Sequence, residues 1–243
     1  MAQDPQKEIE FFNRFAQDKD YDSLTDYGYK SIIKAFKRHA GARLDSVQTG
    51  VDLGCGTGSF TRRFFTPAIK AFGVDISIQA VERAQSKKDE IVYFVSDISA
   101  LGIKSNSVDL VVFSGVLHHF PDPAPVLKEA YRILRKGGLL LSYDPHIKHP
   151  GMWLYRHPSS PFFSKIGKTD NEILLSKEGM QSRLKETGFT GVQTTAISGV
   201  GISYLESPLA RLFLPFYNCL EFILGLLPVA DDIGSFLICS AEK

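Results

Sequence analysis

The fold is decided by VDLGCGTG, residues 51–58, which predicts an apolar strand, a glycine-rich turn and the start of a helix. Glycine lacks a Cβ and adopts positive φ readily, so three glycines at alternate positions let the backbone lie close against a ligand. We therefore predict that residues 54–58 form a ligand-binding turn.

A dinucleotide-binding turn has a related pattern, G-x-G-x-x-G, whose third glycine lets the helix pack closely against its strand. Ser59 stands where that third glycine would be. The spacing G-x-G-x-G, preceded by the acidic Asp52, suits a cofactor without a pyrophosphate better than NAD. A tight turn with no ligand is the other interpretation of this motif when it is taken alone.

Residues 51–58 closely resemble the first motif of the class I S-adenosylmethionine (SAM)-dependent methyltransferases, in the small-molecule, methyltransferase type 11-like group. That resemblance implies SAM as the cofactor and S-adenosylhomocysteine (SAH) as its product. It also implies an α/β fold that is Rossmann-like and doubly wound.

Around the turn, apolar runs alternate with segments of helical periodicity. The expected strands cover 47–53, 69–74, 91–95, 108–113, 138–143, 189–198 and 235–241, and the expected helices cover 59–65, 77–88, 124–134 and 176–187. Such alternation is typical of a parallel sheet with helices on both faces, whose ligands lie beyond the carboxyl ends of the strands. The resemblance implies seven strands, mostly parallel, with a final antiparallel strand.

Acidic residues end two of these strands. Asp75 follows Gly54 by 21 residues (75 − 54), the separation at which a carboxylate can bind the hydroxyls of a ribose. The resemblance implies that Asp97 accepts a hydrogen bond from the adenine amine and that Ile98 packs against the ring. A turn or helix cap is the alternative for a lone acid at a strand end. The predicted cofactor contacts are Tyr21, Asp52, Gly54, Cys55, Gly56, Gly58, Asp75, Ile76, Asp97, Ile98 and Ser114.

Residues 9–40 mix aromatic and charged side chains at helical spacing, which predicts two helices interrupted around residues 20–26. A helical layer packed on the sheet explains most of these aromatic residues. By resemblance, a tyrosine in such a leader closes over the cofactor, and Tyr21 and Tyr27 are the candidates.

A histidine pair follows the fourth expected strand, in LHHFPD, residues 117–122. Pro121 and Pro123 prevent that strand from continuing, so the pair is expected at the functional edge of the sheet. The motif resembles methyltransferases that act on sugars, natural products or quinone rings. It lacks the Asn/Asp-Pro-Pro-Tyr sequence that would indicate methylation of an amide or base nitrogen.

Asp144 ends the neighbouring expected strand. In some sugar O-methyltransferases of the resembling group, a histidine and an acid at these positions are the proposed bases, so the predicted catalytic residues are His118, His119 and Asp144. A histidine titrates near neutral pH and can remove the proton of a hydroxyl, whereas a hydrogen-bonded scaffold role is the alternative for each. No metal site is expected, because His146 and His149 near Asp144 lack a convincing ligand pattern.

With 44% hydrophobic residues among 243, the composition supports one domain over 1–243. We expect an N-terminal helical cap at 1–46, a SAM-binding core at 47–198 and 235–243, and an apolar helical insertion at 199–234. The formal net charge of +1 argues against nucleic acid as a substrate. Three scattered cysteines and a polar start predict a cytoplasmic protein.

Residues 199–230 are far more apolar than a surface hairpin needs. Arg211, Glu221 and Asp231 divide them into runs shorter than the roughly 18 residues of a spanning helix. Three interpretations remain: a cap over an apolar acceptor pocket, a homodimer interface, or a helix on a membrane surface. Residues 146–168 have little periodicity and predict a loop or lid.

Together these features predict a SAM-dependent methyltransferase that acts on a small organic acceptor with apolar character. The expected reaction is O-methylation of a hydroxyl on a sugar, natural product or quinone-like compound. A SAM-fold enzyme of another reaction class and a non-catalytic SAM-binding partner protein are the alternatives.

Overall fold

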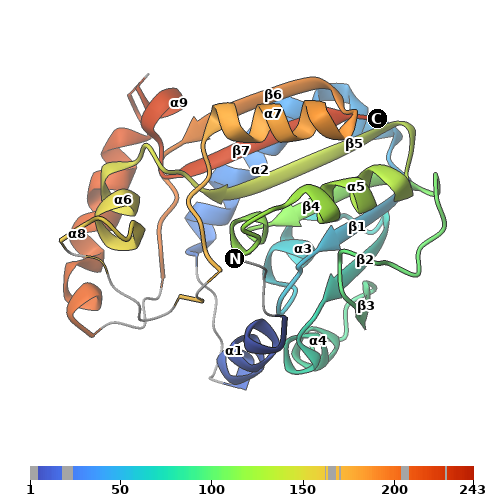
Figure 1. Cartoon of the computed structure of the whole chain (residues 1–243), viewed down its shortest axis with the longest axis horizontal. Coiled ribbons are helices and arrows are strands. Elements are labelled where there is room, and N and C mark those ends of the chain that lie inside the picture. Colours follow the sequence, from blue (N-terminus) through green and yellow to red (C-terminus); the bar gives the residue numbers. More distant parts are fainter. Residues whose placement is uncertain are drawn as a thin grey trace.

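A seven-stranded sheet forms the centre of the computed structural model, which describes residues 5–17, 24–161, 163, 168–169, 171–203, 208–227 and 229–243 (Figure 1). The strands lie in the order β3-β2-β1-β4-β5-β7-β6. Their bounds are β1 Thr49–Leu53, β2 Lys70–Asp75, β3 Val92–Val95, β4 Val108–Ser114, β5 Leu134–Pro145, β6 Thr190–Ile197 and β7 Phe236–Glu242. β7 runs antiparallel to β5 and β6, whereas the other neighbouring strands are parallel. The predicted Rossmann-like sheet with a final antiparallel strand is confirmed.

Helices cover both faces of this sheet. Their bounds are α1 Pro5–Gln17, α2 Asp26–Ala40, α3 Ser59–Phe64, α4 Ile78–Gln85, α5 Ala124–Ile133, α6 Pro150–Arg156, α7 Lys177–Thr187, α8 Pro208–Leu224 and α9 Ala230–Ile233, with short 3₁₀ helices η1 Gly41–Ser46 and η2 Leu117–His119. One apolar core contains Phe36 of α2 and Phe60 of α3, and the other contains Leu127 of α5 and Leu184 of α7. Both faces are therefore buried, as strands that are apolar throughout require.

The first helix, α1, packs against α4 (Figure 1). The Ser77 hydroxyl donates a hydrogen bond to Asn13 Oδ1 at 2.7 Å, and Arg83 donates one to the carbonyl of Ala16. Because α4 begins just after β2 ends, these contacts hold α1 near the carboxyl ends of the strands. Two N-terminal helices were expected from the sequence, and the structure contains them.

One strand is longer than its apolar run predicts. The sequence predicts a helix over 124–134 and a strand over 138–143, but α5 stops at Ile133 and β5 begins at Leu134. Leu134 already pairs with Val108, ahead of a register shift between β4 and β5. The pairing with β4 therefore extends the strand beyond its apolar run.

A helix also occupies part of the segment predicted as a loop or lid. α6 begins after His149, whose Nδ1 accepts a hydrogen bond from the Met152 N–H at 3.1 Å, with Pro150 in the first turn. Both features favour a helix start. Seven residues are too few to display a helical apolar period, which explains why the sequence pattern did not reveal this helix.

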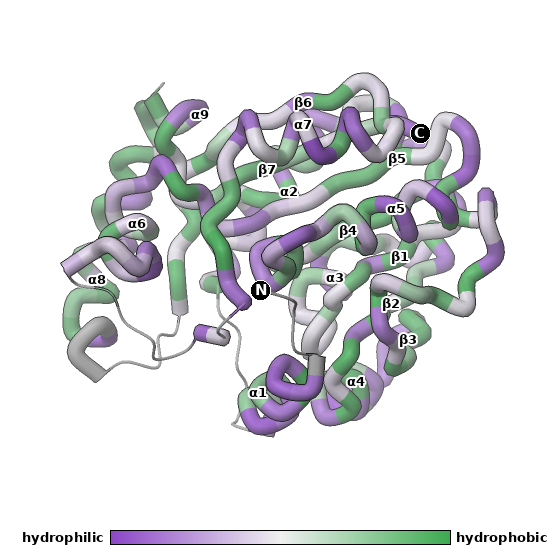
Figure 2. Tube along the Cα trace, in the orientation of Figure 1, coloured by the Kyte–Doolittle hydropathy of each residue, from purple (hydrophilic) through white to green (hydrophobic). Residues whose placement is uncertain are grey.

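The insertion between β6 and β7 forms α8 and α9, and α8 lies with α6 at one end of the molecule (Figure 1). Figure 2 shows hydrophobic residues along much of α8. Leu212, Phe213 and Phe216 are 74%, 61% and 78% exposed. Among the described residues, no helix combines the length and the hydropathy that crossing a bilayer requires. The insertion is helical, and its outer face is apolar.

Candidate active site

A cavity lies at the carboxyl ends of β1, β2 and β4, where α1 covers them. Open α/β sheets bind their ligands at this edge. The lining residues are Glu8, Phe12, Phe15, Ala16, Tyr29, Gly54, Cys55, Gly56, Thr57, Ser59, Phe60, Asp75, Ile76, Ala80, Asp97, Ile98, Ser114, Gly115, Val116, His119, Phe120 and Tyr143. The predicted cofactor residues in this lining are Gly54, Cys55, Gly56, Asp75, Ile76, Asp97, Ile98 and Ser114.

The glycine turn leaves room for a ligand at Gly56. Its φ is +52°, and a Cβ added there would meet no other atom within 4 Å, although the residue lines the cavity. Gly54 differs, since a Cβ there would lie 2.5 Å from Val116. A side chain at position 56 would therefore extend into open space in the cavity wall, whereas one at 54 would disturb the loop after β4.

Asp75 ends β2 with its carboxylate in the cavity wall. Oδ2 accepts a hydrogen bond from the Gly56 N–H at 2.8 Å, and Oδ1 accepts one from the Ser77 N–H at 2.9 Å. Burial raises the pKa of Asp75, and the backbone N–H groups of Ser77, Gly56 and Ile76 oppose that rise. An ionised carboxylate has about four acceptor positions, so both oxygens keep capacity for ribose hydroxyls.

The predicted adenine-binding residues lie together in the lining. Asp97 Oδ1 accepts a hydrogen bond from the Ser99 N–H at 2.8 Å, and Ile98 is buried beside it. Asp97 thus makes the local turn contact that was its alternative role, and its Oδ2 remains for a ligand. Ser114, at the end of β4, donates a hydrogen bond to the Gly54 carbonyl at 3.3 Å.

Asp52 and Gly58 are placed differently from the prediction. Asp52 is fully buried below the turn, where Oδ2 accepts a hydrogen bond from Thr61 at 2.7 Å and burial raises its pKa to about 7. A Cβ on Gly58 would lie 2.7 Å from the Tyr93 hydroxyl, so that glycine makes room for packing. Neither Asp52 nor Gly58 lines the cavity, so the structure does not support their predicted cofactor contact. Tyr21 lies outside the described residues.

The second tyrosine candidate and the insertion also lie away from the cavity. Tyr27 is absent from the lining and packs against Phe222 of α8 with ring centroids 5.9 Å apart, whereas Tyr29 lines the cavity. None of the described α8 residues lines the cavity. The structure therefore does not support a cap formed by α8 over the pocket.

His118 and Asp144 form a buried pair at the ends of β4 and β5. Ser114 and Tyr143 are paired in these adjacent strands, which brings the residues that follow them together. Asp144 Oδ1 lies 2.9 Å from His118 Nδ1 and accepts the His118 backbone N–H at 3.1 Å. Burial lowers the pKa of His118 to about 4 and raises that of Asp144 well above its usual value. Neither residue lines the cavity, so the pair lies outside the lining and can act only by positioning the loop that carries His119.

His119 is the predicted catalytic residue that lines the cavity. Its Nδ1 lies 3.6 Å from Glu8 Oε2, 4.0 Å from Glu172 Oε1 and 3.4 Å from Thr169 Oγ1. Burial lowers the pKa of His119 to about 3, His118 adds to that effect, and Glu172 and Glu8 oppose it. The imidazole is therefore neutral near pH 7, with two carboxylates close enough to stabilise its protonated form.

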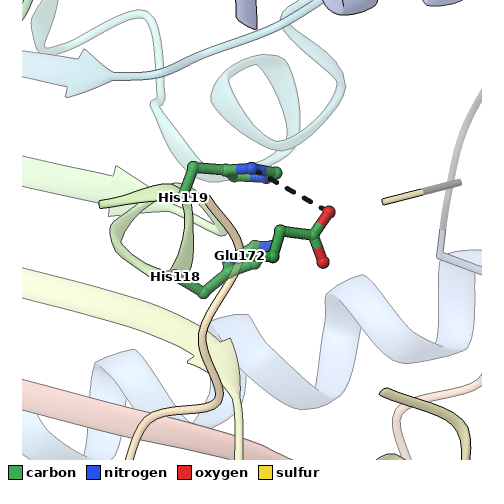
Figure 3. Close-up of side chains that lie close together, drawn as sticks. All are labelled: His118, His119 and Glu172. Atoms are coloured by element: carbon green, nitrogen blue, oxygen red, sulfur yellow. Dashed lines mark ion pairs between the residues drawn. The ribbon is translucent and has the colours of Figure 1, made fainter. Parts of the chain in front are cut away.

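Glu172 and Glu8 are site residues that the sequence analysis did not identify. Figure 3 shows the Glu172 carboxylate beside the two histidine rings. Glu172 also pairs with Arg156 of α6, whose carbonyl accepts a hydrogen bond from Lys168 at 2.6 Å. Burial acts to raise the pKa of Glu172, but Arg156, the two histidines and Lys168 outweigh it, and the pKa lies below its usual value. No motif marks either glutamate.

The cavity residues fit SAM. Asp75 offers carboxylate oxygens for two hydroxyls, Asp97 and Ile98 offer an acceptor and an apolar wall for a base, and Gly56 leaves the space that a side chain would fill. The apolar and aromatic remainder of the lining, including Phe12, excludes water from the methyl donor.

Comparison with known proteins agrees with this fit. Residues 51–142 match the methyltransferase domain family model. The chain is 29% identical over 158 residues to demethylmenaquinone methyltransferase of Lactococcus lactis, covering 58% of this chain and 62% of the relative. It is 35% identical over 101 residues to 27-O-demethylrifamycin SV methyltransferase of Amycolatopsis mediterranei, covering 39% and 37%. The matches thus span less than two thirds of these relatives.

The fold is similar to that of a SAM-dependent methyltransferase from Thermotoga maritima, with a TM-score of 0.63 and 20% identity over 96% of this chain and 99% of that one. At that identity the likeness concerns the fold, whereas the matched domain and the glycine turn identify the cofactor as SAM. Residues 51–142 thus form a methyltransferase domain, and the sequence and the fold are similar to those of class I SAM-dependent methyltransferases.

Proposed function

We propose that this chain transfers the methyl group of SAM to a hydroxyl of a small, partly apolar acceptor, such as a natural product, a sugar or a quinone-like compound. The name of one relative supports an oxygen acceptor, since it is named for a rifamycin oxygen, and the name of the other supports a quinone-like acceptor. The aromatic lining contributed by Phe12, Phe15 and Phe120 favours an acceptor with an apolar ring.

The observation that carries the proposal is the position of the His119 imidazole in the cavity wall. Methylating a hydroxyl releases a proton, and a group in the cavity has to accept it. His119 has an unprotonated nitrogen at neutral pH, and the Glu8 and Glu172 carboxylates would stabilise the imidazolium that forms. The low pKa of His119 makes it a weak base, which suits a phenolic hydroxyl better than an aliphatic one.

The remaining residues bind and orient. When bound, SAM supplies a sulfonium methyl that is already activated towards nucleophiles. Asp75 and Gly56, which line the cavity, would hold its ribose, and Asp97 and Ile98 would hold its adenine. The contact of His118 with Asp144 fixes the loop that carries His119. His119 is therefore in position before the molecule to be methylated binds.

Release of SAH with a panel of acceptors tests the proposal. A hydroquinone or phenol should give SAH and a product heavier by one methylene unit, and the matching methyl ether should give neither. His119→Gln should lower turnover by roughly 10²–10⁴ with unchanged SAM affinity, whereas His157→Gln, outside the cavity, should behave as wild type. SAM binding without turnover on any acceptor would favour a non-catalytic partner protein. Full activity of His119→Gln would refute the role of His119.

A further inference from the structure

Two histidines and one glutamate converge beside the cavity (Figure 3). One ring nitrogen of His118, one of His119 and one carboxylate oxygen of Glu172 lie within 4.8 Å of one another. Two imidazoles and a carboxylate are a common donor set for zinc and related divalent metals. Donors about 2.0–2.2 Å from one metal lie up to about 4 Å apart, so small side-chain rotations would bring all three into range.

Asp144 gives His118 the orientation that a ligand needs. Asp144 Oδ1 accepts the His118 backbone N–H at 3.1 Å and lies 2.9 Å from His118 Nδ1. An oxygen that already acts as an acceptor assigns the ring proton to Nδ1, which leaves the lone pair on Nε2. A carboxylate bound to the far nitrogen of the imidazole is the usual support of a histidine that binds a metal.

Glu8 supplies a fourth oxygen, from α1. Its side chain is 4% exposed, and its Oε1 accepts a hydrogen bond from Asn171 at 2.7 Å. Its Oε2 lies 3.6 Å from His119 Nδ1 and has no hydrogen-bond partner among the described residues. A buried carboxylate oxygen without a partner is costly, and a cation held between Glu8 and His119 would satisfy it.

Arg156 does not block the metal-binding oxygen of Glu172, because it pairs with Oε2 and leaves Oε1 towards the histidines. Arg156 pairs with Oε2, whereas Oε1 faces His119 at 4.0 Å and accepts the Thr169 N–H at 3.2 Å.

We propose that His118, His119 and Glu172 bind a divalent transition metal of the zinc class, with Glu8 as the fourth ligand. The site is separate from the residues that fit SAM but shares His119 with the proposed function, so a bound metal would take the lone pair that otherwise accepts the proton. Metal binding itself does not depend on the proposed acceptor. Because Glu8 belongs to α1 and the histidines follow β4, the metal would tie the first helix to the sheet.

Cobalt(II) is the probe, because its visible absorption reports tetrahedral nitrogen and oxygen ligands. The full chain, treated with a chelator and free of SAM and acceptor, should bind one Co²⁺ that Zn²⁺ displaces. Glu172→Gln and Glu8→Gln should each weaken Co²⁺ binding at least tenfold, and Asp144→Asn by about 10–100-fold through the orientation of His118. His157→Asn, a partly exposed histidine outside the cluster, should bind as wild type.

A wild-type chain that binds no Co²⁺ overturns the proposal. Wild-type affinity in both glutamate variants overturns it too, as does a loss in His157→Asn, which would place the metal on a surface histidine. Circular dichroism checks folding, and Glu8→Gln keeps the test valid where Glu172→Gln, which leaves Arg156 without its pair, does not fold. Since SAM and acceptor are absent, a negative result leaves the proposed function standing.

Discussion

A buried acid should decide the stability of the apolar insertion. Glu221 of α8 is 1% exposed, and its Oε1 lies 2.9 Å from His149 Nε2. His149 Nδ1 accepts the Met152 N–H, so Nε2 carries the ring proton and faces the Glu221 carboxylate. Glu221 Oε2 accepts hydrogen bonds from the Ser235 hydroxyl and, at 3.2 Å, from the Gly199 N–H. One carboxylate thus joins α8 to α6 and to both ends of the insertion.

Glu221→Ala removes the acceptor of two buried donors and the carboxylate that faces the His149 ring. Deleting one member of a buried, hydrogen-bonded pair costs about 3–5 kcal/mol, because the donors left behind have lost their contact with water as well. For a chain of 243 residues each kcal/mol lowers the melting temperature by about 2 °C, so the expected fall in Tm is about 6–10 °C. Calorimetry of the full chain measures this fall.

The matched control is an exposed acid with one ion pair. Glu178 lies 2.8 Å from Lys148, and the two side chains are 65% and 48% exposed. Water screens a pair this exposed, so Glu178→Ala should shift Tm by no more than about 2 °C. A Glu221→Ala shift as small as that of the control would refute the reasoning, since the buried carboxylate would then contribute no more than a solvated one.

Other predictions concern the cavity and the exposed face of α8. Asp75→Ala and Gly56→Val should each weaken SAM binding at least about 100-fold in calorimetry while the chain stays folded. Asp75→Ala would remove charged hydrogen bonds to the cofactor, and Gly56→Val would fill the space that the cofactor needs. Unchanged affinity in either variant would contradict the cofactor assignment. With the pKa of His119 at about 3, turnover should stay level between pH 7.5 and 5.5, whereas a base of ordinary histidine pKa would lose about tenfold. If the exposed face of α8 is a homodimer interface, Leu212→Glu combined with Phe216→Glu should abolish self-association in light scattering without changing SAM affinity. A wild-type monomer that sediments with liposomes would instead indicate that this face binds a membrane surface.

The sheet could be predicted because its signals are local and repeated. Each parallel strand is a short apolar run, each run is followed by a helical period, and the glycine turn at 54–58 fixes which edge binds the ligand. The pattern fails where pairing outweighs local preference, as at Leu134, which continues into β5 instead of ending a helix. It also fails at α6, whose seven residues depend on the His149 cap.

The site residues that end strands could also be predicted from the local pattern. Asp75 and Asp97 end strands, so their register alone places them in the cavity wall. Asp52 lies in the same motif, but side chains alternate between the two faces of a strand. The side chain of Asp52 therefore faces α3, where it accepts a hydrogen bond from Thr61. Glu8 and Glu172 could not be predicted, because they come from a helix and a loop that reach the histidines only through tertiary packing.

The apolar insertion is connected to the active site although no described residue of α8 lines the cavity. α6 connects the two, since His149 at its start binds Glu221 of α8 and Arg156 at its end binds Glu172 beside the histidines. Both glutamates are nearly inaccessible to solvent, so each contact is retained at the cost of desolvation and resists small displacements. The position of Glu172 therefore depends on α6, and that of α6 on its contact with the insertion, so the insertion supports the glutamate that lies beside the two histidines.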